Sequence, residues 1–258
     1  MYERSGRLAD QRGFAPFTDE VVSEATPKRV RAVKDGEPVL DSIQARLAWV
    51  EGPTPQYAVP AADVDGQRVR FGDPFDDDRL GTVEPVGLDG GRPERAHGLR
   101  VVDPPPSAPG LEDHVLLAWD AVDEWYVEDE RQRGHPRDPY HRIDLHTSSR
   151  EVVVDLDEAR LATSTRPLML VETGLPVRFY LPPEDVRSDL LEESSTRTRC
   201  AYKGQARYWH AHGRGSDVED AAWSYEEPVA AFERLAGWVC FDQAKVDVIV
   251  DGEPLGEG

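Results

Sequence analysis

Short runs of alternating apolar and polar residues, separated by turn residues, follow one another along most of the chain. An alternation with a period of two is typical of β-strands that bury one face. In the first half, strands are expected at residues 29–33, 38–42, 46–50, 56–59, 114–119 and 124–128. Asp35 and Gly36 stand between the first two strands and predict a tight hairpin turn, because both residue types accept positive φ angles.

The second half continues this pattern. Strands are expected at residues 150–156, 160–164, 168–172, 177–181, 205–210, 221–225, 238–241 and 246–251, and a helical turn at 182–185. A helix is predicted between Pro228 and Gly237 by the spacing of Val229, Phe232, Leu235 and Ala236. Together the patterns predict a mainly β fold: two tandem, compact antiparallel β domains with about one short helix each.

Three segments depart from the strand pattern. Residues 1–27 form a polar leader, and residues 131–149 join the two halves. Residues 65–113 are rich in glycine, proline and aspartate, so we expect this insert to be mostly loop, with one or two strands at 67–71 and 99–102.

The two halves also resemble each other at a constant spacing. Three pairs of matching residues lie 122 positions apart, namely Ser42 with Ser164, Asp63 with Asp185, and Asp120 with Asp242. This period is too long for a solenoid repeat and indicates a duplicated domain. We therefore expect a first, degenerate repeat at 28–130 and a second repeat at 150–258. Only the second contains the motif at 200–209, so we expect the site there.

Charge narrows the set of partners. The 258 residues include 30 basic and 50 acidic side chains, which gives a formal net charge of −20. A protein that binds the phosphate backbone of DNA or RNA needs a basic face, so we expect no nucleic-acid partner. The same charge argues against binding to anionic membranes. A small-molecule ligand is expected, and a protein partner is the alternative.

Two features favour the cytoplasm. Cys200 and Cys240 are the two cysteines, and the absence of a cysteine-dense framework favours a reducing compartment. No apolar run approaches the ~20 residues needed to span a bilayer, and the first residues lack the apolar core of a signal peptide. We therefore expect a cytoplasmic protein.

The segment 200–204 is the first candidate for chemistry. Cys200 precedes Lys203 by three positions, and a nearby cation lowers the pKa of a thiol. Residues three apart on a strand face opposite sides, so this pairing needs a turn, which Gly204 permits. Cys200 and Lys203 are therefore candidate catalytic residues. The alternative is a small buried cysteine beside a turn.

Aromatic residues gather in the same part of the chain. The candidate ligand-binding aromatic residues are Tyr202, Tyr208, Trp209, Trp223 and Tyr225. Aromatic walls bind planar or cationic ligands, while the alternative is a β core built from large side chains. Alternation predicts that Trp209 and Trp223 lie on different strands of one wall.

A third candidate lies at 172–180. Arg178 and Tyr180 are two residues apart on an expected strand, so they share a face. Arginine offers a planar fork for a carboxylate or a phosphate. Glu172 is either a further ligand contact or the partner of Arg178 in an ion pair across a turn.

The joining segment adds histidines and aspartates, namely His135, Asp138, His141, Asp144 and His146. Histidine and carboxylate suit zinc or iron, yet no paired metal motif accompanies them, so we expect no metal. Asp138 and His141 are assigned to ligand contact or to a salt bridge between the domains. Phosphate loops, nucleophile elbows and dinucleotide fingerprints are absent, and the sequence names no cofactor.

Several motifs of the second half occur together: Glu172-Thr-Gly-Leu-Pro, Arg178-Phe-Tyr-Leu-Pro, Glu184-Asp-Val, Thr196-Arg-Thr-Arg-Cys, Tyr202-Lys-Gly, Tyr208-Trp, Ala222-Trp-Ser-Tyr and Lys245-Val-Asp-Val. With them the chain resembles the bacterial family of the domain of unknown function 427, over about 135–253 and more weakly over 28–130. The joining segment looks like that of the family's tandem members.

The resemblance implies a compact antiparallel fold of the β-tent kind, similar to Mss4-like and methionine-sulfoxide-reductase-like domains. Many domains of that group hold zinc on paired Cys-x-x-Cys motifs, which this chain lacks, so no metal is carried over. Family naming also suggests a nucleotidyltransferase.

These observations support three hypotheses. The first is an uncharacterised cytoplasmic protein whose second domain holds a small-molecule pocket, in which Arg178 and Lys203 orient an anionic group. The second is an enzyme that performs nucleotide-dependent transfer or thiol chemistry at Cys200. The third is a non-catalytic interaction module, in which the acidic first repeat docks a protein partner through the insert at 65–113.

Overall fold

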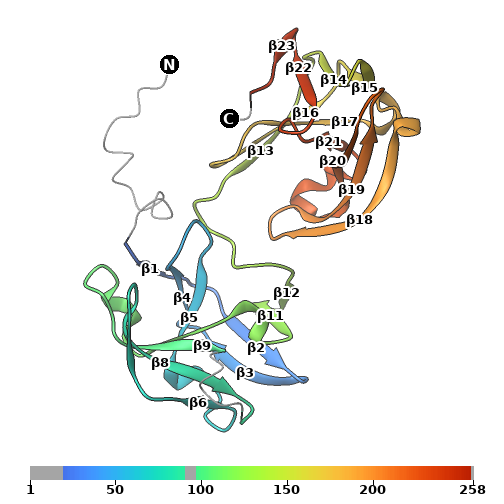
Figure 1. The fold of residues 1–258 in the computed structure, drawn as a ribbon. Coiled ribbons are helices and arrows are strands. Elements are labelled where there is room, and N and C mark those ends of the chain that lie inside the picture. The colour runs from blue at the N-terminus through green and yellow to red at the C-terminus, as the bar shows by residue number, and fades with distance from the viewer. Residues whose placement is uncertain (1–19, 91–96, 257–258) are drawn as a thin grey trace. The chain divides into compact units, whose positions relative to one another are not determined.

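The computed structural model describes residues 20–90 and 97–256, which form antiparallel β-sheets and short 3-10 helices. Two compact units follow each other along the chain (Figure 1), the first ending at Tyr140 and the second beginning at His141. The predicted mainly β class is confirmed. Within the described ranges, no helix is long and apolar enough to cross a bilayer.

The first unit contains a large and a small sheet. Its elements are β1 (Val22–Ala25), β2 (Val30–Lys34), β3 (Glu37–Ser42), β4 (Arg46–Trp49), β5 (Gln56–Pro60), η2 (Ala61–Asp63), β6 (Val69–Phe71), β7 (Phe75–Asp77), β8 (Gly81–Leu88), β9 (Gly98–Asp103), η3 (Pro109–Leu111), β10 (His114–Leu117), η4 (Trp119–Ala121), β11 (Glu124–Val127) and β12 (Glu130–Gln132). The large sheet has the order β1-β4-β5-β10-β9-β8-β6, with β7 also paired to β8, and the small sheet has the order β12-β11-β2-β3.

The second unit is built in the same way. Its elements are β13 (Ile143–Thr147), β14 (Val152–Leu156), β15 (Ala159–Ser164), β16 (Leu168–Glu172), β17 (Arg178–Leu181), η5 (Pro183–Asp185), η6 (Ser188–Leu190), β18 (Leu191–Cys200), β19 (Gly204–His212), β20 (Asp217–Pro228), η7 (Ala230–Leu235), β21 (Val239–Phe241), β22 (Asp247–Val250) and β23 (Glu253–Pro254). The large sheet has the order β13-β16-β17-β21-β20-β19-β18, and the small sheet has the order β15-β14-β22-β23.

The strands of the two units occupy matching places. From one edge of the large sheet, β1, β4, β5, β10, β9 and β8 correspond to β13, β16, β17, β21, β20 and β19. A side-chain hydrogen bond is repeated as well. Ser42 Oγ donates to Asp63 at 2.6 Å, and Ser164 is hydrogen-bonded to Asp185 at the position 122 residues later. The repeated topology supports the duplication that the sequence predicts.

The third pair of matched aspartates is not structurally equivalent, and this prediction was wrong. The backbone N–H of Ala121 donates to the carbonyl of Ala118 at 3.1 Å, and that of Lys245 donates to the carbonyl of Asp242 at 2.8 Å. These two turns are therefore equivalent, so Asp242 corresponds to Ala118 and not to Asp120. The spacing changes because the intervening strands differ in length between the units.

Two segments are more regular than the sequence predicts. Within the expected leader, β1 pairs with β4, while residues 1–19 lie outside the described ranges. The insert at 65–113, expected to be mostly loop, contains β6, β7, β8 and β9. Strand β8 escapes prediction because Pro85 interrupts it, although Val83 and Val86 are fully buried.

The turns follow local backbone preferences. Asp35 and Gly36 both have positive φ angles, 54° and 79°, as predicted for the hairpin of β2 and β3. The predicted helix before Gly237 is instead η7, in which 3-10 turns are broken at Phe232. Gly237 has a φ of 72° and follows this element, as predicted. The segment between Pro228 and Gly237 is too short to form a stable α-helix by its own propensity.

Each large sheet has two apolar faces. One face packs against the small sheet and forms the main core, as Val59 does in the first unit and Leu181 in the second. The opposite face carries a separate cluster that includes Ala58 in the first unit and Tyr180 in the second. Neighbouring residues divide in this way because successive side chains on a strand point to opposite faces. We call the face that points away from the small sheet the outer face.

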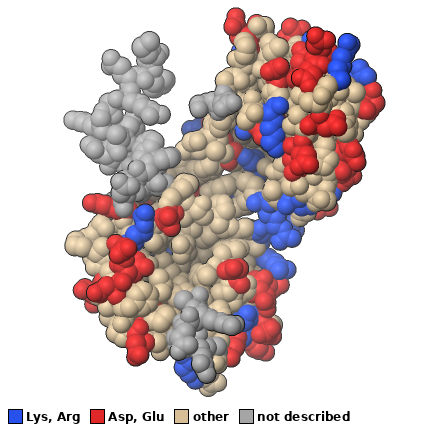
Figure 2. Space-filling view, in the orientation of Figure 1, with Lys and Arg blue, Asp and Glu red and all other residues tan. Residues whose placement is uncertain are grey.

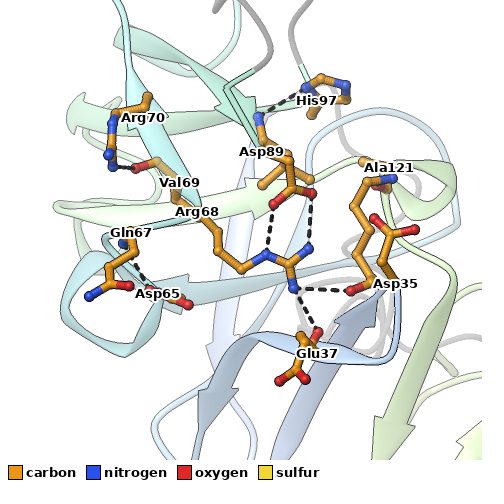
Figure 3. A network of polar contacts seen from close by, with 12 residues as sticks. Asp35, Glu37, Asp65, Gln67, Arg68, Val69, Arg70, Asp89, His97 and Ala121 are labelled. Atoms are coloured by element: carbon orange, nitrogen blue, oxygen red, sulfur yellow. Dashed lines mark hydrogen bonds and ion pairs between the residues drawn. The ribbon is translucent and has the colours of Figure 1, made fainter.

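Arg68 ties the two sheets of the first unit together (Figure 3). Its Nε and NH2 groups donate to the two carboxylate oxygens of Asp89, at 2.7 and 2.9 Å, just after β8. Its NH1 group donates to the carbonyls of Lys34 and Glu37, at 3.0 and 2.9 Å, across the β2–β3 turn. A single guanidinium thus joins the small-sheet hairpin to the end of a large-sheet strand.

Candidate functional site

A row of side chains crosses the outer face of the large sheet in the second unit. Strand pairing places Tyr180 opposite Cys240, Cys240 opposite Trp223, and Trp223 opposite Tyr208. Directly paired residues on neighbouring strands point to the same face. The four side chains therefore lie side by side on β17, β21, β20 and β19.

Hydrogen bonds extend along this row. Trp223 Nε1 donates to the Tyr180 hydroxyl at 3.1 Å, and the Tyr208 hydroxyl lies 2.8 Å from Thr198 Oγ1. Burial raises the pKa of Tyr180 well above its ordinary value, and burial also raises the pKa of Tyr225. Both phenols therefore stay protonated at neutral pH and remain available as neutral hydrogen-bond donors.

A pocket of about 270 Å³ opens over the row. Seven predicted site residues line it, namely Glu172, Arg178, Tyr180, Lys203, Tyr208, Trp223 and Tyr225. Leu175, Pro176, Asp220, Asp242 and Lys245 complete the lining and were not predicted. The lining therefore combines an aromatic wall with three cationic and three acidic side chains.

Arg178 lies against the aromatic wall and is held in place by polar groups. Its guanidinium carbon is 5.2 Å from the centre of the Trp223 ring. Its NH1 group donates to Asp242 Oδ1 at 3.3 Å and to Gln243 Oε1 at 3.2 Å. The alternative of an ion pair between Arg178 and Glu172 is not what the structure shows, because Arg178 pairs with Asp242 instead.

Glu172 holds the second cation of the pocket. The Lys203 ammonium donates to Glu172 Oε2, and His141 Nε2 lies 2.9 Å from Glu172 Oε1. The His141 ring packs against the Tyr202 ring with centroids 4.4 Å apart. The side chain of Glu172 is 5 % exposed and that of His141 is 19 % exposed. The contacts therefore lead from the half-buried His141 ring, through the buried Glu172 carboxylate, to Lys203 in the pocket.

A tight turn directs Lys203 toward the pocket. Gly204 has a φ of 115°, and a Cβ atom there would lie 2.8 Å from the carbonyl oxygen of Glu227. Glycine is therefore required where β18 turns into β19, as the sequence indicates. Lys203 precedes this turn, and Glu172 ends β16. Strands β17, β21 and β20 lie between β16 and β19 in the sheet, so the contact is made by side chains from strands that are not neighbours.

Comparison with known proteins finds a family that this unit resembles. Residues 144–252 match the family model described as Domain of unknown function (DUF427). The second unit is similar to this family, and we call it the DUF427 domain after that match. The match lies within the second unit and spans β13 to β22, so it includes the strands that form the pocket. A comparison with curated proteins finds no match for the chain.

The remaining predicted residues lie elsewhere. Trp209 is half-buried and packs against the core between the sheets of the DUF427 domain, with Arg207 over its ring at 4.6 Å, so it does not share a wall with Trp223. The register explains this difference, because Trp223 pairs with Tyr208 and Trp209 pairs with Ala222 on the opposite face. This expectation was wrong.

The predicted thiol and the joining segment also lie outside the lining. Cys200 is half-buried against the outer-face cluster. Asp138 belongs to the first unit, where its carboxylate accepts a hydrogen bond from the backbone N–H of Tyr140 at 2.8 Å. Within residues 20–90 and 97–256, no three His, Cys, Asp or Glu side chains are grouped as a metal ion would require.

One sequence signal could have revealed an unpredicted residue. The chain has four lysines, so Lys245 is as noticeable as Lys203. Its ammonium donates to the carbonyls of Glu219 and Asp220 at 3.0 and 3.2 Å, at the rim of the pocket. Asp242 opens the turn that contains Lys245, so both side chains reach the pocket from one short loop.

The first unit has apolar residues at the same places. Equivalent strand pairing there joins Ala58 to Leu116, Leu116 to Leu99, and Leu99 to Pro85. Leu80 precedes Gly81 at the start of β8, as Lys203 precedes Gly204 at the start of β19, and it is buried in the outer-face cluster. The first unit therefore has the topology of the DUF427 domain without the polar groups of its pocket.

Proposed function

We propose that the DUF427 domain binds a small molecule that carries an anionic group and a planar part. One observation carries this proposal: the pocket brings Arg178 and Lys203 beside Trp223 and Tyr208, and acidic side chains hold both cations. Cations fixed by hydrogen bonds and an aromatic wall are the features that orient such ligands.

The cations retain capacity for a ligand. A guanidinium has five N–H donors, and both contacts of Arg178 with Asp242 and Gln243 use NH1. An ammonium has three donors, and Lys203 uses one on Glu172. A carboxylate or phosphate oxygen entering the pocket can therefore accept hydrogen bonds without breaking the contacts that position these side chains.

The surrounding charge makes local cations necessary. Figure 2 shows acidic side chains spread over both units on the face in view. The chain has a net charge of −20, so its mean field repels a small anion. An anionic ligand then needs specific contacts inside the pocket. The first unit offers no such contacts, because Gln56 and Leu80 stand in place of Arg178 and Lys203.

A thermal-shift panel on the full chain tests this proposal. The panel contains nucleotides, amino acids, small carboxylates and thiol compounds, and calorimetry follows any hit. A ligand that binds only the native state at 100 times its Kd stabilises it by about 2.7 kcal/mol. The variants Arg178→Gln and Trp223→Leu, which introduce the residues of the first unit, are expected to lose about tenfold or more in affinity.

Arg160→Ala is the matched control, because Arg160 is an exposed arginine of the small sheet that pairs with Asp155. It should leave binding unchanged. If no anionic compound stabilises the protein, or if the pocket variants bind as well as the wild type, the proposal is wrong.

Nucleotidyl transfer is not the reaction that this geometry favours. Asp155 and Asp157 have an Asp-x-Asp spacing, but they lie on the β14–β15 hairpin of the small sheet. Asp155 pairs with Arg160, and Asp157 accepts a hydrogen bond from Ser216. Neither aspartate is part of the pocket lining.

A further inference from the structure

Lys203 is buried inside a ligand-sized pocket, in contact with a buried carboxylate. Lys203 is 8 % exposed and Glu172 is 6 % exposed, and both line the pocket. A buried ion pair adds little net stability, because the cost of desolvating both charges offsets their attraction. The pair therefore calls for an explanation other than folding.

The first unit shows that the fold does not need this ion pair. Leu80 occupies the place of Lys203 before the glycine turn, and Val50 stands 122 residues before Glu172. Leu80 is buried in the outer-face cluster, and Val50 packs against that cluster. The same architecture thus has apolar residues at these two positions in one unit and a lysine and a glutamate in the other.

We propose that Lys203 forms an imine with a small anionic aldehyde or ketone bound in this pocket. This inference rests on the proposed binding function and adds the chemical class of the ligand. Lysine amines in pockets are the side chains that add to carbonyl groups, provided that a neighbouring group accepts their proton. Glu172 is that neighbour, since its Oε2 is in contact with Lys203 Nζ.

The step balances with the groups present. The Lys203 ammonium gives one proton to Glu172, and the amine nitrogen forms a bond to the carbonyl carbon while the carbonyl electron pair moves to oxygen. That oxygen takes the proton back from Glu172. The nitrogen then loses a second proton, which joins the departing hydroxyl, so one ammonium and one carbonyl compound yield one protonated imine and one water.

The neighbours of the pair have separate roles. Arg178 binds the anionic group of the carbonyl compound, which places the reacting carbon near Lys203. His141 is a positioning residue, because its Nε2 lies 2.9 Å from Glu172 Oε1 and it touches the pocket only through that carboxylate. It orients Glu172 and connects it with solvent.

Reductive trapping on the full chain tests the proposal. Pyridoxal phosphate is the probe, since it combines an aldehyde, a planar ring and a phosphate, and pyridoxal without the phosphate is its matched control. Sodium cyanoborohydride supplies the hydride that converts an imine into a stable secondary amine. Peptide mapping by mass spectrometry then compares the chain's four lysines, at positions 28, 34, 203 and 245.

The expected result is an adduct on Lys203 that exceeds the adduct on each other lysine by about tenfold, with pyridoxal reacting much less. In Arg178→Gln, pyridoxal phosphate should label Lys203 no better than pyridoxal does, because the phosphate has lost its partner. Glu172→Gln should slow labelling about tenfold. His141→Phe keeps a ring against Tyr202, and it should change the shape of the pH–rate profile, which a purely structural residue would not do.

Four outcomes overturn the imine. Equal labelling of all four lysines, or preferential labelling of Lys245, shows that Lys203 has no special reactivity. If pyridoxal phosphate stabilises the wild type in the thermal-shift assay but leaves Lys203 unlabelled, the imine is wrong while the binding function stands. If the panel stabilises nothing and Lys203 is unlabelled, both fail. Circular dichroism and the melting temperature of each variant confirm that it is folded.

Discussion

At the scale of single residues, the two cysteines occupy different environments on one sheet face. Cys240 is fully buried between Tyr180 and Trp223, and burial raises the pKa of its thiol to about 12. The thiolate is the reactive form, so Cys240 is held in its unreactive thiol form at pH 8. Cys200 is half-buried and lies at the end of β18.

We predict that iodoacetamide at pH 8 modifies Cys200 in the native protein and leaves Cys240 unmodified until the chain is denatured. Intact-mass spectrometry with and without urea measures this difference. A Cys200 that reacts as fast as a free thiol would keep the thiol hypothesis open. A Cys200 that reacts only in urea would remove it, and rapid modification of native Cys240 would contradict the burial described here.

His212 provides a prediction on pH. Its Nδ1 lies 2.8 Å from Asp217 Oδ1 and its Nε2 lies 3.4 Å from Glu192 Oε2, which joins β18, β19 and β20. The hydrogen bond to Asp217 raises the pKa of His212 above the ordinary 6.5. Its contribution to stability is therefore complete below pH 6.5 and disappears as the pH rises through the higher value in the folded state.

An NMR titration of the imidazole measures this pKa directly. Asp217→Asn should bring the pKa of His212 back toward its ordinary value, and it should flatten the change in melting temperature across that pH window. An unchanged imidazole pKa in Asp217→Asn would show that Asp217 is not the cause.

At the scale of elements, two glycines show why particular turns need this residue. Gly204 and Gly237 both have positive φ angles, 115° and 72°. A Cβ atom at Gly204 would meet the Glu227 carbonyl oxygen at 2.8 Å, whereas one at Gly237 would meet nothing within 4 Å. Alanine at Gly237 would therefore cause backbone strain alone, whereas alanine at Gly204 would cause strain and a close contact.

We predict that Gly237→Ala lowers the free energy of unfolding by about 1 kcal/mol, from the positive φ angle alone. Gly204→Ala should lower it by about 3 kcal/mol, because strain and the close contact both act. Urea denaturation of the full chain measures both variants. If both variants lose the same free energy of unfolding, β20 shifts away from residue 204 without cost.

Arg68 gives an element-scale prediction for the first unit. Arg68→Ala removes two bonds to Asp89 and two to backbone carbonyls (Figure 3), and it should lower the free energy of unfolding by about 2–3 kcal/mol. Arg68→Lys should recover little, because an ammonium cannot replace the planar fork. Arg70→Ala is the control, since Arg70 is exposed and bonds only to nearby carbonyls. If Arg70→Ala destabilises the protein as much as Arg68→Ala does, the network has no special role.

Element prediction succeeded where apolar residues alternate and failed where they do not. Burial alternates along β2 and β14, and both strands lie where they were expected. The 3-10 helix η5 lies within the helical turn expected at 182–185. Strand β18 was missed because its sequence, Leu191–Cys200, is almost entirely polar, and it forms by pairing with β19 rather than by burying a face of its own. Strand β8 was missed because a proline stands within it.

At the scale of the whole molecule, equivalent positions of the two units can be compared within one protein. They share strand order and turns, yet one has Leu80 buried in an outer-face cluster against which Val50 packs, where the other buries Lys203 beside Glu172. This comparison suggests which substitutions the fold accepts.

We predict that the double variant Glu172→Val with Lys203→Leu is at least as stable as the wild type, because both buried charges are replaced by apolar groups. Lys203→Leu alone should lower the free energy of unfolding by about 3–5 kcal/mol, since it leaves a buried carboxylate without its cation. Urea denaturation compares the two. A double variant that is less stable than Lys203→Leu would show that the pair is structural after all.

The sequence by itself determined the fold class, the repeat and most of the pocket's residue types, because alternation, turn chemistry and a constant spacing are local or linear properties. Only the tertiary structure decided which residues meet. Register sends Tyr208 to the pocket and Trp209 to the core, although they are adjacent in the chain. Glu172 contacts Lys203 across 31 positions, from a strand that is not a neighbour of β19 in the sheet, and no linear pattern encodes that contact.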